Sequence, residues 1–153
     1  MALHTDTEIY RATYDLTKMV TAYVANMERN YRADFGAELR RRCMTLVMRT
    51  YEANTSDDKP PILRRMRQEV EAVNLSLRLA KDLKQISPKQ YGNAIALTAS
   101  IAKQATGWQR HSESALVAES SRRPGQCAME SGRAAGAQPH RQAQQGYQRQ
   151  QPE

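Results

Sequence analysis

Apolar residues recur at alternating spacings of three and four within residues 60–86, and this spacing constrains the fold more than any other feature of the chain. The members of this stripe are Leu63, Met66, Val70, Val73, Leu77 and Ala80. Because an α-helix has about 3.6 residues per turn, residues spaced in this way lie on one helical face. The pattern predicts a helix with Pro60 and Pro61 in its first turn, where a missing backbone N–H costs no hydrogen bond.

The same spacing occurs in two earlier segments. In residues 6–30 the stripe consists of Ile9, Thr13, Leu16, Val20, Tyr23 and Met27. In residues 34–54 it consists of Leu39, Cys43, Leu46, Thr50 and Ala53. We therefore predict a helix in each segment, with Thr5 or Asp6 capping the first and Asp34 capping the second.

A fourth helix is predicted to begin at Ser87-Pro88-Lys89-Gln90, a sequence typical of a capping box. Its stripe consists of Tyr91, Ile95, Thr98, Ala102 and Ala105. Gly107 is expected to end this helix. Four helices of about 20 residues with short connections predict an all-α fold, an antiparallel up-down four-helix bundle over residues 1–110.

Residues 111–153 differ in composition from the rest of the chain. Branched apolar residues are scarce, while Gln, Arg, Gly, Ser and Pro accumulate. Such a segment buries too little surface to offset the entropy lost on ordering. We expect a disordered Gln/Arg/Gly-rich tail, with at most a short helical extension around residues 114–121.

The third predicted helix carries a second apolar set on roughly the opposite side of the helical wheel. This set consists of Ala72, Leu75, Leu79, Leu83 and Ile86. It predicts an oligomer interface, and the alternative is that a thicker core or the region of Trp108 covers it.

Positive charge is concentrated in the second and third predicted helices. The chain carries 23 Lys and Arg against 16 Asp and Glu, a net charge of +7. Residues 29–49 hold six Arg against two acidic residues, whereas residues 1–28 hold two basic residues against four acidic ones. The candidate phosphate-binding residues are Arg40, Arg41, Arg42, Arg49, Arg64, Arg65, Arg67, Arg78 and Lys81. Arg is suited to clamping phosphate, although a run of charge is also typical of a solvated face, and Arg78 could instead pair with Asp82.

The residue patterns of common catalytic and metal sites do not occur in the predicted helices. His4, His111 and His140 lie outside them, no Glu-x-x-His pair exists, and Cys43 lies on a stripe where a small buried side chain is expected. We therefore expect no enzyme activity, no metal and no cofactor. The sequence MALHTDTEIYR does not resemble a signal peptide and no segment has about 20 consecutive apolar residues, so we expect a cytoplasmic protein without membrane contact.

Several short motifs between about residues 14 and 109 resemble a known family. They are Phe35-Gly36 followed by Glu38-Leu39-Arg40, Tyr51-Glu52-Ala53-Asn54, Leu77-Arg78-Leu79-Ala80, Ile86-Ser87-Pro88-Lys89-Gln90-Tyr91 and Gly107-Trp108. Together they resemble the four-helix-bundle family that includes the accessory variability determinant proteins of diversity-generating retroelements and the proteins encoded in ribosomal RNA intervening sequences.

This resemblance implies a ring-like homo-oligomer, a pentamer, that binds RNA or DNA and a partner reverse transcriptase. The chain would then be an accessory protein that handles template RNA or complementary DNA during sequence diversification. The alternative, implied by the intervening-sequence relatives, is a structural or protein-interaction bundle with no direct role in nucleic-acid binding.

Overall fold

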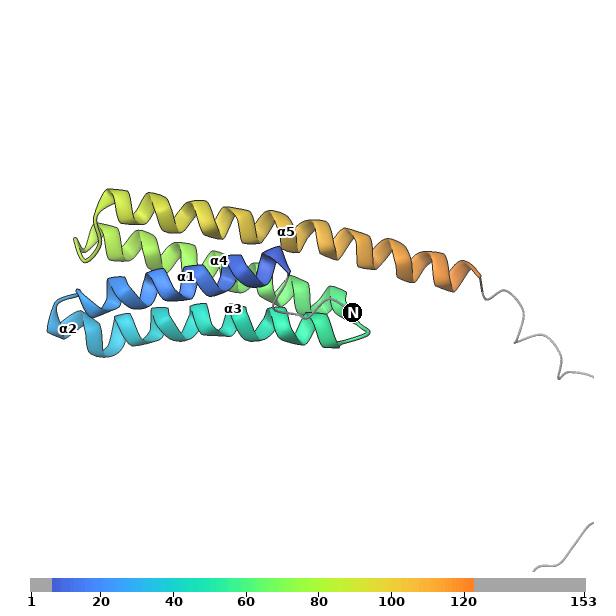
Figure 1. Cartoon of the computed structure of the whole chain (residues 1–153), viewed down its shortest axis with the longest axis horizontal. Coiled ribbons are helices and arrows are strands. Elements are labelled where there is room, and N and C mark those ends of the chain that lie inside the picture. Colours follow the sequence, from blue (N-terminus) through green and yellow to red (C-terminus); the bar gives the residue numbers. More distant parts are fainter. Residues whose placement is uncertain (1–6, 123–153) are drawn as a thin grey trace, which may run out of the picture. The chain divides into compact units, whose positions relative to one another are not determined.

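The protein is all-α over residues 7–122, the part of the chain that the computed structural model describes, which confirms the all-α part of the predicted fold class. Figure 1 shows four long helices and two short helical segments. They are α1 (Glu8–Ala25), α2 (Arg29–Tyr31), the π-helical segment η2 (Arg32–Gly36), α3 (Ala37–Thr55), α4 (Lys59–Asp82) and α5 (Pro88–Ser121).

The four long helices pack around one shared core in a bundle-like arrangement. Helices α1 and α4 each pack against both α3 and α5. In Figure 1, α1 and α4 run in one direction and α3 and α5 in the other, and α5 extends beyond the ends of its neighbours. The last turns of α5 consequently lie outside the packed part of the molecule.

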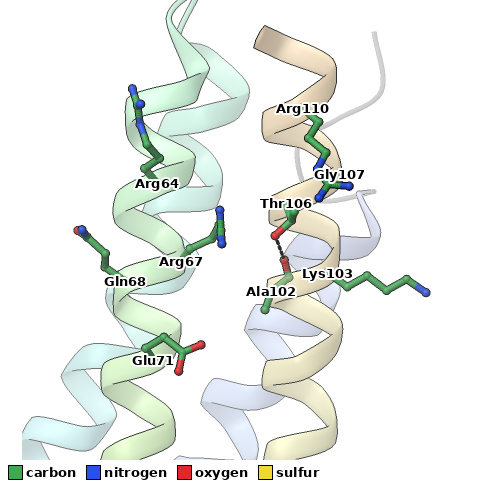
Figure 2. Close-up of a pocket in the computed structure, with 9 residues that line it drawn as sticks. All are labelled: Arg64, Arg67, Gln68, Glu71, Ala102, Lys103, Thr106, Gly107 and Arg110. Carbon is green, nitrogen blue, oxygen red and sulfur yellow. Dashed lines mark hydrogen bonds between the residues drawn. The ribbon is translucent and has the colours of Figure 1, made fainter. Parts of the chain in front are cut away.

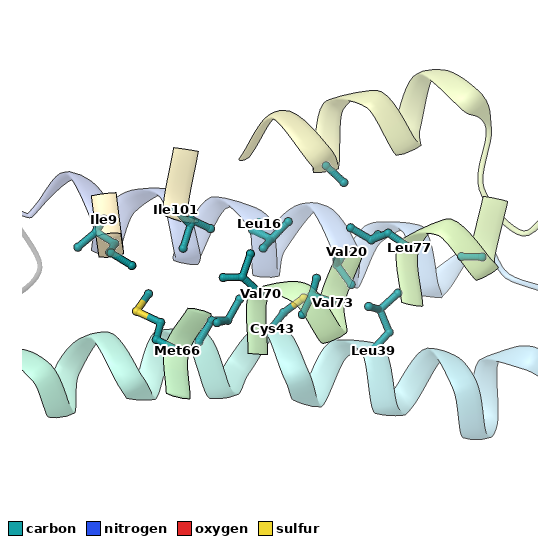
Figure 3. Close-up of a cluster of buried hydrophobic side chains, with 14 of the residues drawn as sticks. Ile9, Leu16, Val20, Leu39, Cys43, Met66, Val70, Val73, Leu77 and Ile101 are labelled. Carbon is teal, nitrogen blue, oxygen red and sulfur yellow. The ribbon is translucent and has the colours of Figure 1, made fainter. Parts of the chain in front are cut away.

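The core is formed by the predicted stripes. Every residue predicted on the second and third stripes is buried, from Leu39 to Ala53 in α3 and from Leu63 to Ala80 in α4. In α1 the buried positions include Val24 rather than the predicted Tyr23, which is only partly buried. Figure 3 shows Leu16, Val20 and Ile101 among the side chains of this core.

The break between the first two predicted helices lies earlier in the chain than predicted, at residues 26–28 instead of 31–33. Helix α1 ends at Ala25 and its N-cap position is Thr7, so neither end of the predicted 6–30 segment is correct. The chain becomes helical again at Arg29. Asp34 therefore lies inside η2 and is not the N-cap of the next helix.

Gly36 is the residue that allows this early helical start to pack against α1. It is buried at the end of η2, and a Cβ atom built there would lie 2.7 Å from Val24 Cγ1 and 3.4 Å from the carbonyl oxygen of Tyr31. The first distance is shorter than carbon atoms tolerate, and the β-branched Val24 side chain has little rotamer freedom in a helix with which to move away. A residue with a side chain at this position would push η2 away from α1.

We expect Gly36→Ala to lower the free energy of unfolding by about 1–3 kcal/mol, the usual cost of overpacking a core. Urea denaturation followed by circular dichroism measures this change. Gly92→Ala is the matched control, because a Cβ atom at Gly92 would have nothing within 4 Å. It should stabilise the helix by about 0.5–1 kcal/mol. Equal stability of the parent and Gly36→Ala would contradict the packing described above.

Helix α4 ends at Asp82, four residues before the predicted end at Ile86. Lys84 has a φ of 58°, in the left-handed region. The N–H of Gln85 donates to the carbonyl oxygen of Ala80 at 2.8 Å, and that of Lys84 to Lys81 at 2.9 Å, which together form a Schellman motif. Because the chain reverses here, Ile86 turns inward and is buried in the core.

Helix α5 begins as predicted and ends later than predicted. Ser87 and Gln90 form the capping box, with Pro88 in the first turn. The buried positions are Ala94, Thr98, Ile101 and Ala105, so the predicted Tyr91, Ile95 and Ala102 are only partly buried at the edge of the stripe.

Gly107 does not end α5, which continues to Ser121. Trp108 packs against the core one residue later and supports the continuation. The predicted boundary at residue 110 therefore falls within a helix, and the predicted extension over residues 114–121 is part of that helix. The disorder predicted for the remainder of the tail lies outside the described residues.

Candidate nucleic-acid interface

Three of the four Arg residues of α3 are paired with carboxylates, and one of these pairs joins α3 to α4. Arg42 binds Glu69 of α4 at 3.1 Å and Glu38 of its own helix at 3.0 Å. Arg41 also pairs with Glu38. Arg49 pairs with Glu52 about two turns farther along α3. We call these residues the α3/α4 seam: Glu38, Arg41, Arg42, Arg49, Glu52 and Glu69.

The seam therefore contains three Arg and three Glu and has no net charge. Its side chains are partly exposed, so each ion pair contributes little to stability. A phosphate group approaching the seam would have to displace a carboxylate from each guanidinium. This makes the seam a poor binding site despite its high content of Arg.

A second basic surface lies between α4 and α5 and has a different charge balance. Here the structure contains a groove of about 730 Å³. Its lining residues are Arg64, Arg67, Gln68, Glu71, Ala102, Lys103, Thr106, Gly107 and Arg110. We call this site the α4/α5 groove. It holds four basic side chains against the single carboxylate of Glu71.

None of these four cations forms an ion pair within residues 7–122. Arg67 Nη1 instead donates a hydrogen bond to the amide oxygen Oε1 of Gln109 at 3.4 Å. Figure 2 shows Arg67 reaching from α4 toward α5, and the head group of Arg110 lying beside Gly107. Lys103 extends away from α4 at the rim. The groove therefore presents positive charge with little internal compensation.

The structure separates the eight Arg residues among the nine predicted phosphate-binding residues into three groups. Arg64 and Arg67 line the α4/α5 groove. Arg41, Arg42 and Arg49 belong to the seam. Arg40, Arg65 and Arg78 are exposed and form no ion pair within the described part of the chain, but they do not line the groove.

Lys81, the ninth residue, interacts within the protein. Its ammonium nitrogen lies 4.7 Å from the centre of the Tyr91 ring and 3.7 Å from a carboxylate oxygen of Asp82. Asp82 therefore pairs with Lys81, and the predicted alternative of an Arg78–Asp82 pair does not form.

Sequence reasoning missed Lys103 and Arg110, which complete the groove. They lie seven residues apart on α5, a spacing that places them on one face. That spacing was visible in the sequence. The sequence alone did not show that this face of α5 meets α4. The stripe that we predicted for α5 shares only Thr98 and Ala105 with the residues that are buried, so the orientation of the helix about its axis was predicted incorrectly.

The second apolar set of α4 is only partly available as an interface. Leu75 and Leu79 are 69% and 48% exposed, so the core does not cover them. Ala72 and Leu83 are partly buried. Ile86 is 4% exposed and belongs to the core, so its prediction as an interface residue was wrong. The helical wheel placed it incorrectly because α4 ends before it.

Cys43 is buried in the core as predicted, and burial raises the pKa of its thiol to about 12, with a further contribution from the charge of Glu69. Residues 7–122 contain no cluster of three or more His, Cys, Asp or Glu side chains arranged to hold a metal ion. No helix in that range is both long and apolar enough to span a bilayer.

Comparison of the sequence with profiles of known protein families and with curated proteins finds no match.

Proposed function

We propose that the protein is a nucleic-acid-binding accessory protein that holds a phosphate backbone in the α4/α5 groove. The observation that carries this proposal is the contrast between the neutral seam and the groove, where four cations face one carboxylate. Uncompensated Lys and Arg side chains lining a groove bind phosphate groups through charge and, for Arg, through paired hydrogen bonds.

The biological setting that we propose rests on the sequence resemblance. In this proposal the chain is an up-down four-helix bundle in the cytoplasm that assembles into a ring and assists the reverse transcriptase of a diversity-generating retroelement. Exposed Leu75 and Leu79 support assembly, because they lie one turn apart on α4 and exposed apolar patches are typical of protein–protein contact sites. A ring would bring the grooves of several protomers together on one particle.

A second candidate function, a protein-interaction bundle, is supported by α3. Met44, Met48 and Tyr51 are each about half exposed and follow one another at spacings of four and three. They therefore lie along one outer face of the helix. Flexible Met side chains are common at surfaces that bind other proteins.

The salt dependence of binding tests the proposed nucleic-acid function. Mixed-sequence RNA and DNA strands should bind with similar affinity, because phosphates are contacted and base edges are not. The logarithm of the binding constant should fall linearly with the logarithm of salt concentration. The slope should be roughly −3 if four cations each neutralise one phosphate of a single strand. Fluorescence anisotropy measures it, and binding that does not respond to salt would favour the protein-interaction candidate.

A further inference from the structure

Gly107 occupies a position in the α4/α5 groove that the fold itself does not explain. It lies in the interior of α5, where Gly destabilises a helix relative to Ala. A Cβ atom built there would have nothing within 4 Å, so the absence of a side chain relieves no clash. The helix also continues through this residue, so no turn requires it.

The position of Gly107 relates it to the groove cations. It is three residues before Arg110 and four after Lys103, so all three lie on neighbouring turns of the same side of α5. Figure 2 shows the head group of Arg110 beside Gly107. The missing side chain leaves the helix backbone open to the groove at the point where positive charge is close by. Gly is typical of positions where a ligand comes close to the protein backbone.

We propose that an unpaired nucleic-acid strand lies in the α4/α5 groove with its sugar-phosphate backbone against α5 at Gly107. This inference rests on the proposed function and adds the form of the ligand and its point of contact. Arg67 of α4 and Arg110 of α5 contact the strand from the two walls. The strand passes the helix most closely where no Cβ atom stands between them.

The shape of the groove favours a single strand over a duplex. A volume of 730 Å³ is comparable to sites for small molecules, which span about 300–1,000 Å³, and it accommodates a short stretch of one strand. A duplex, whose major groove alone is about 12 Å wide, is too broad to enter a furrow between two packed helices, whose axes lie about 8–10 Å apart. It would touch only the outer rim, whereas a flexible strand reaches both walls.

The composition of the groove indicates how the strand is held. None of its lining residues is aromatic, so bases have no ring on which to stack. Apart from the single carboxylate of Glu71, the charged and amide groups of the groove are guanidinium, ammonium and amide groups, which donate to phosphate and sugar oxygens. The bases therefore point outward and the contact is independent of sequence.

The test compares Gly107→Ala with Gly92→Ala in the full chain. Both glycines lie in α5 with open space around them, and only Gly107 lines the groove. Both variants should raise the melting temperature by about 2–4 °C, because Ala favours the helix. Gly107→Ala should also weaken binding of a 20-nucleotide mixed-sequence strand about tenfold, the loss expected when one charge-assisted contact is prevented. Gly92→Ala should change this binding less than about twofold.

The expected result is therefore a more stable protein that binds more weakly, which a merely structural role of Gly107 would not produce. A duplex of the same sequence should compete poorly with the labelled strand. Gly107→Ala binding as tightly as Gly92→Ala, or a duplex competing as well as the single strand, would overturn the inference. Arg67→Gln separates this outcome from failure of the proposed function. If that variant binds weakly while Gly107→Ala binds normally, the groove binds nucleic acid in another way.

Discussion

Replacing Arg64, Arg67 and Arg110 together by Gln should weaken binding of a mixed-sequence strand by about a hundredfold or more near 0.15 M salt. Each substitution removes one charge-assisted contact, and a hydrogen bond to a charged group contributes about 1.5–3 kcal/mol. Even at the lower end of that range, three such losses exceed a factor of one hundred. Anisotropy titration with a labelled strand measures the change.

The same variant should remain folded. All three residues are exposed and none forms an ion pair within residues 7–122. Among the residues that the structure describes, the only side-chain hydrogen bond removed is the 3.4 Å bond from Arg67 to Gln109, which is close to the limit for such a bond. Helical content and melting temperature should match the parent, so a loss of binding would report on the groove alone. A variant that binds as well as the parent would exclude this site.

The second large effect concerns assembly. The parent should be an oligomer in light scattering, and Leu75→Glu combined with Leu79→Glu should convert it to a monomer of 17.3 kDa. These two side chains lie one turn apart on α4 and are the most exposed members of the apolar set. A carboxylate at each position would have to lose its water in a packed interface, which costs several kcal/mol per ion.

Leu116→Glu combined with Val117→Glu provides the control for this substitution. Both residues are exposed near the C-terminal end of α5, so the variant gains the same charge and loses similar apolar side chains at a different place. This variant should keep the oligomeric state of the parent. A monomeric parent, or two variants that dissociate equally, would contradict the assignment of the interface to α4.

Local periodicity was sufficient to predict the helices and most of the core. The stripe in α4 continues without interruption from Leu63 to Ala80, and every member is buried. The capping box of α5 was equally clear because Ser87, Pro88 and Gln90 each have a defined role at a helix start. Patterns of this kind depend on residues that are close in sequence, so they can be recognised without knowledge of the tertiary fold.

The ends of helices were predicted less well, because competing local structures decide them. Lys84 takes the left-handed conformation that usually favours Gly, so nothing in the sequence marked the end of α4 at Asp82. Gly107 was a reasonable terminator and yet remains helical. Ile86 was assigned to the wrong surface for this reason. The helical wheel of α4 was extended past the true end of the helix, and it therefore placed a core residue in the predicted interface.

Only part of the candidate site, Arg64 and Arg67, could be predicted from the sequence, because the rest depends on contacts between helices. Counting charges along the sequence predicted phosphate-binding residues in both α3 and α4. In the structure, Glu69 of α4 pairs with Arg42 of α3 and helps to neutralise the α3/α4 seam. Arg64 and Arg67 acquire a different environment because α5 supplies Lys103 and Arg110. Only the packing of the helices distinguishes paired from available Arg residues.

The most direct measurement of the central claim compares two variants that lose the same charge. One carries Arg64, Arg67 and Arg110 as Gln in the groove, and the other carries Arg41, Arg42 and Arg49 as Gln in the seam. If the groove binds the phosphate backbone, only the first should bind a mixed-sequence strand about a hundredfold more weakly than the parent, with the salt slope reduced by roughly two to three. The seam variant should stay within about threefold of the parent. Equal losses in the two variants would mean that overall charge, and not the α4/α5 groove, determines binding.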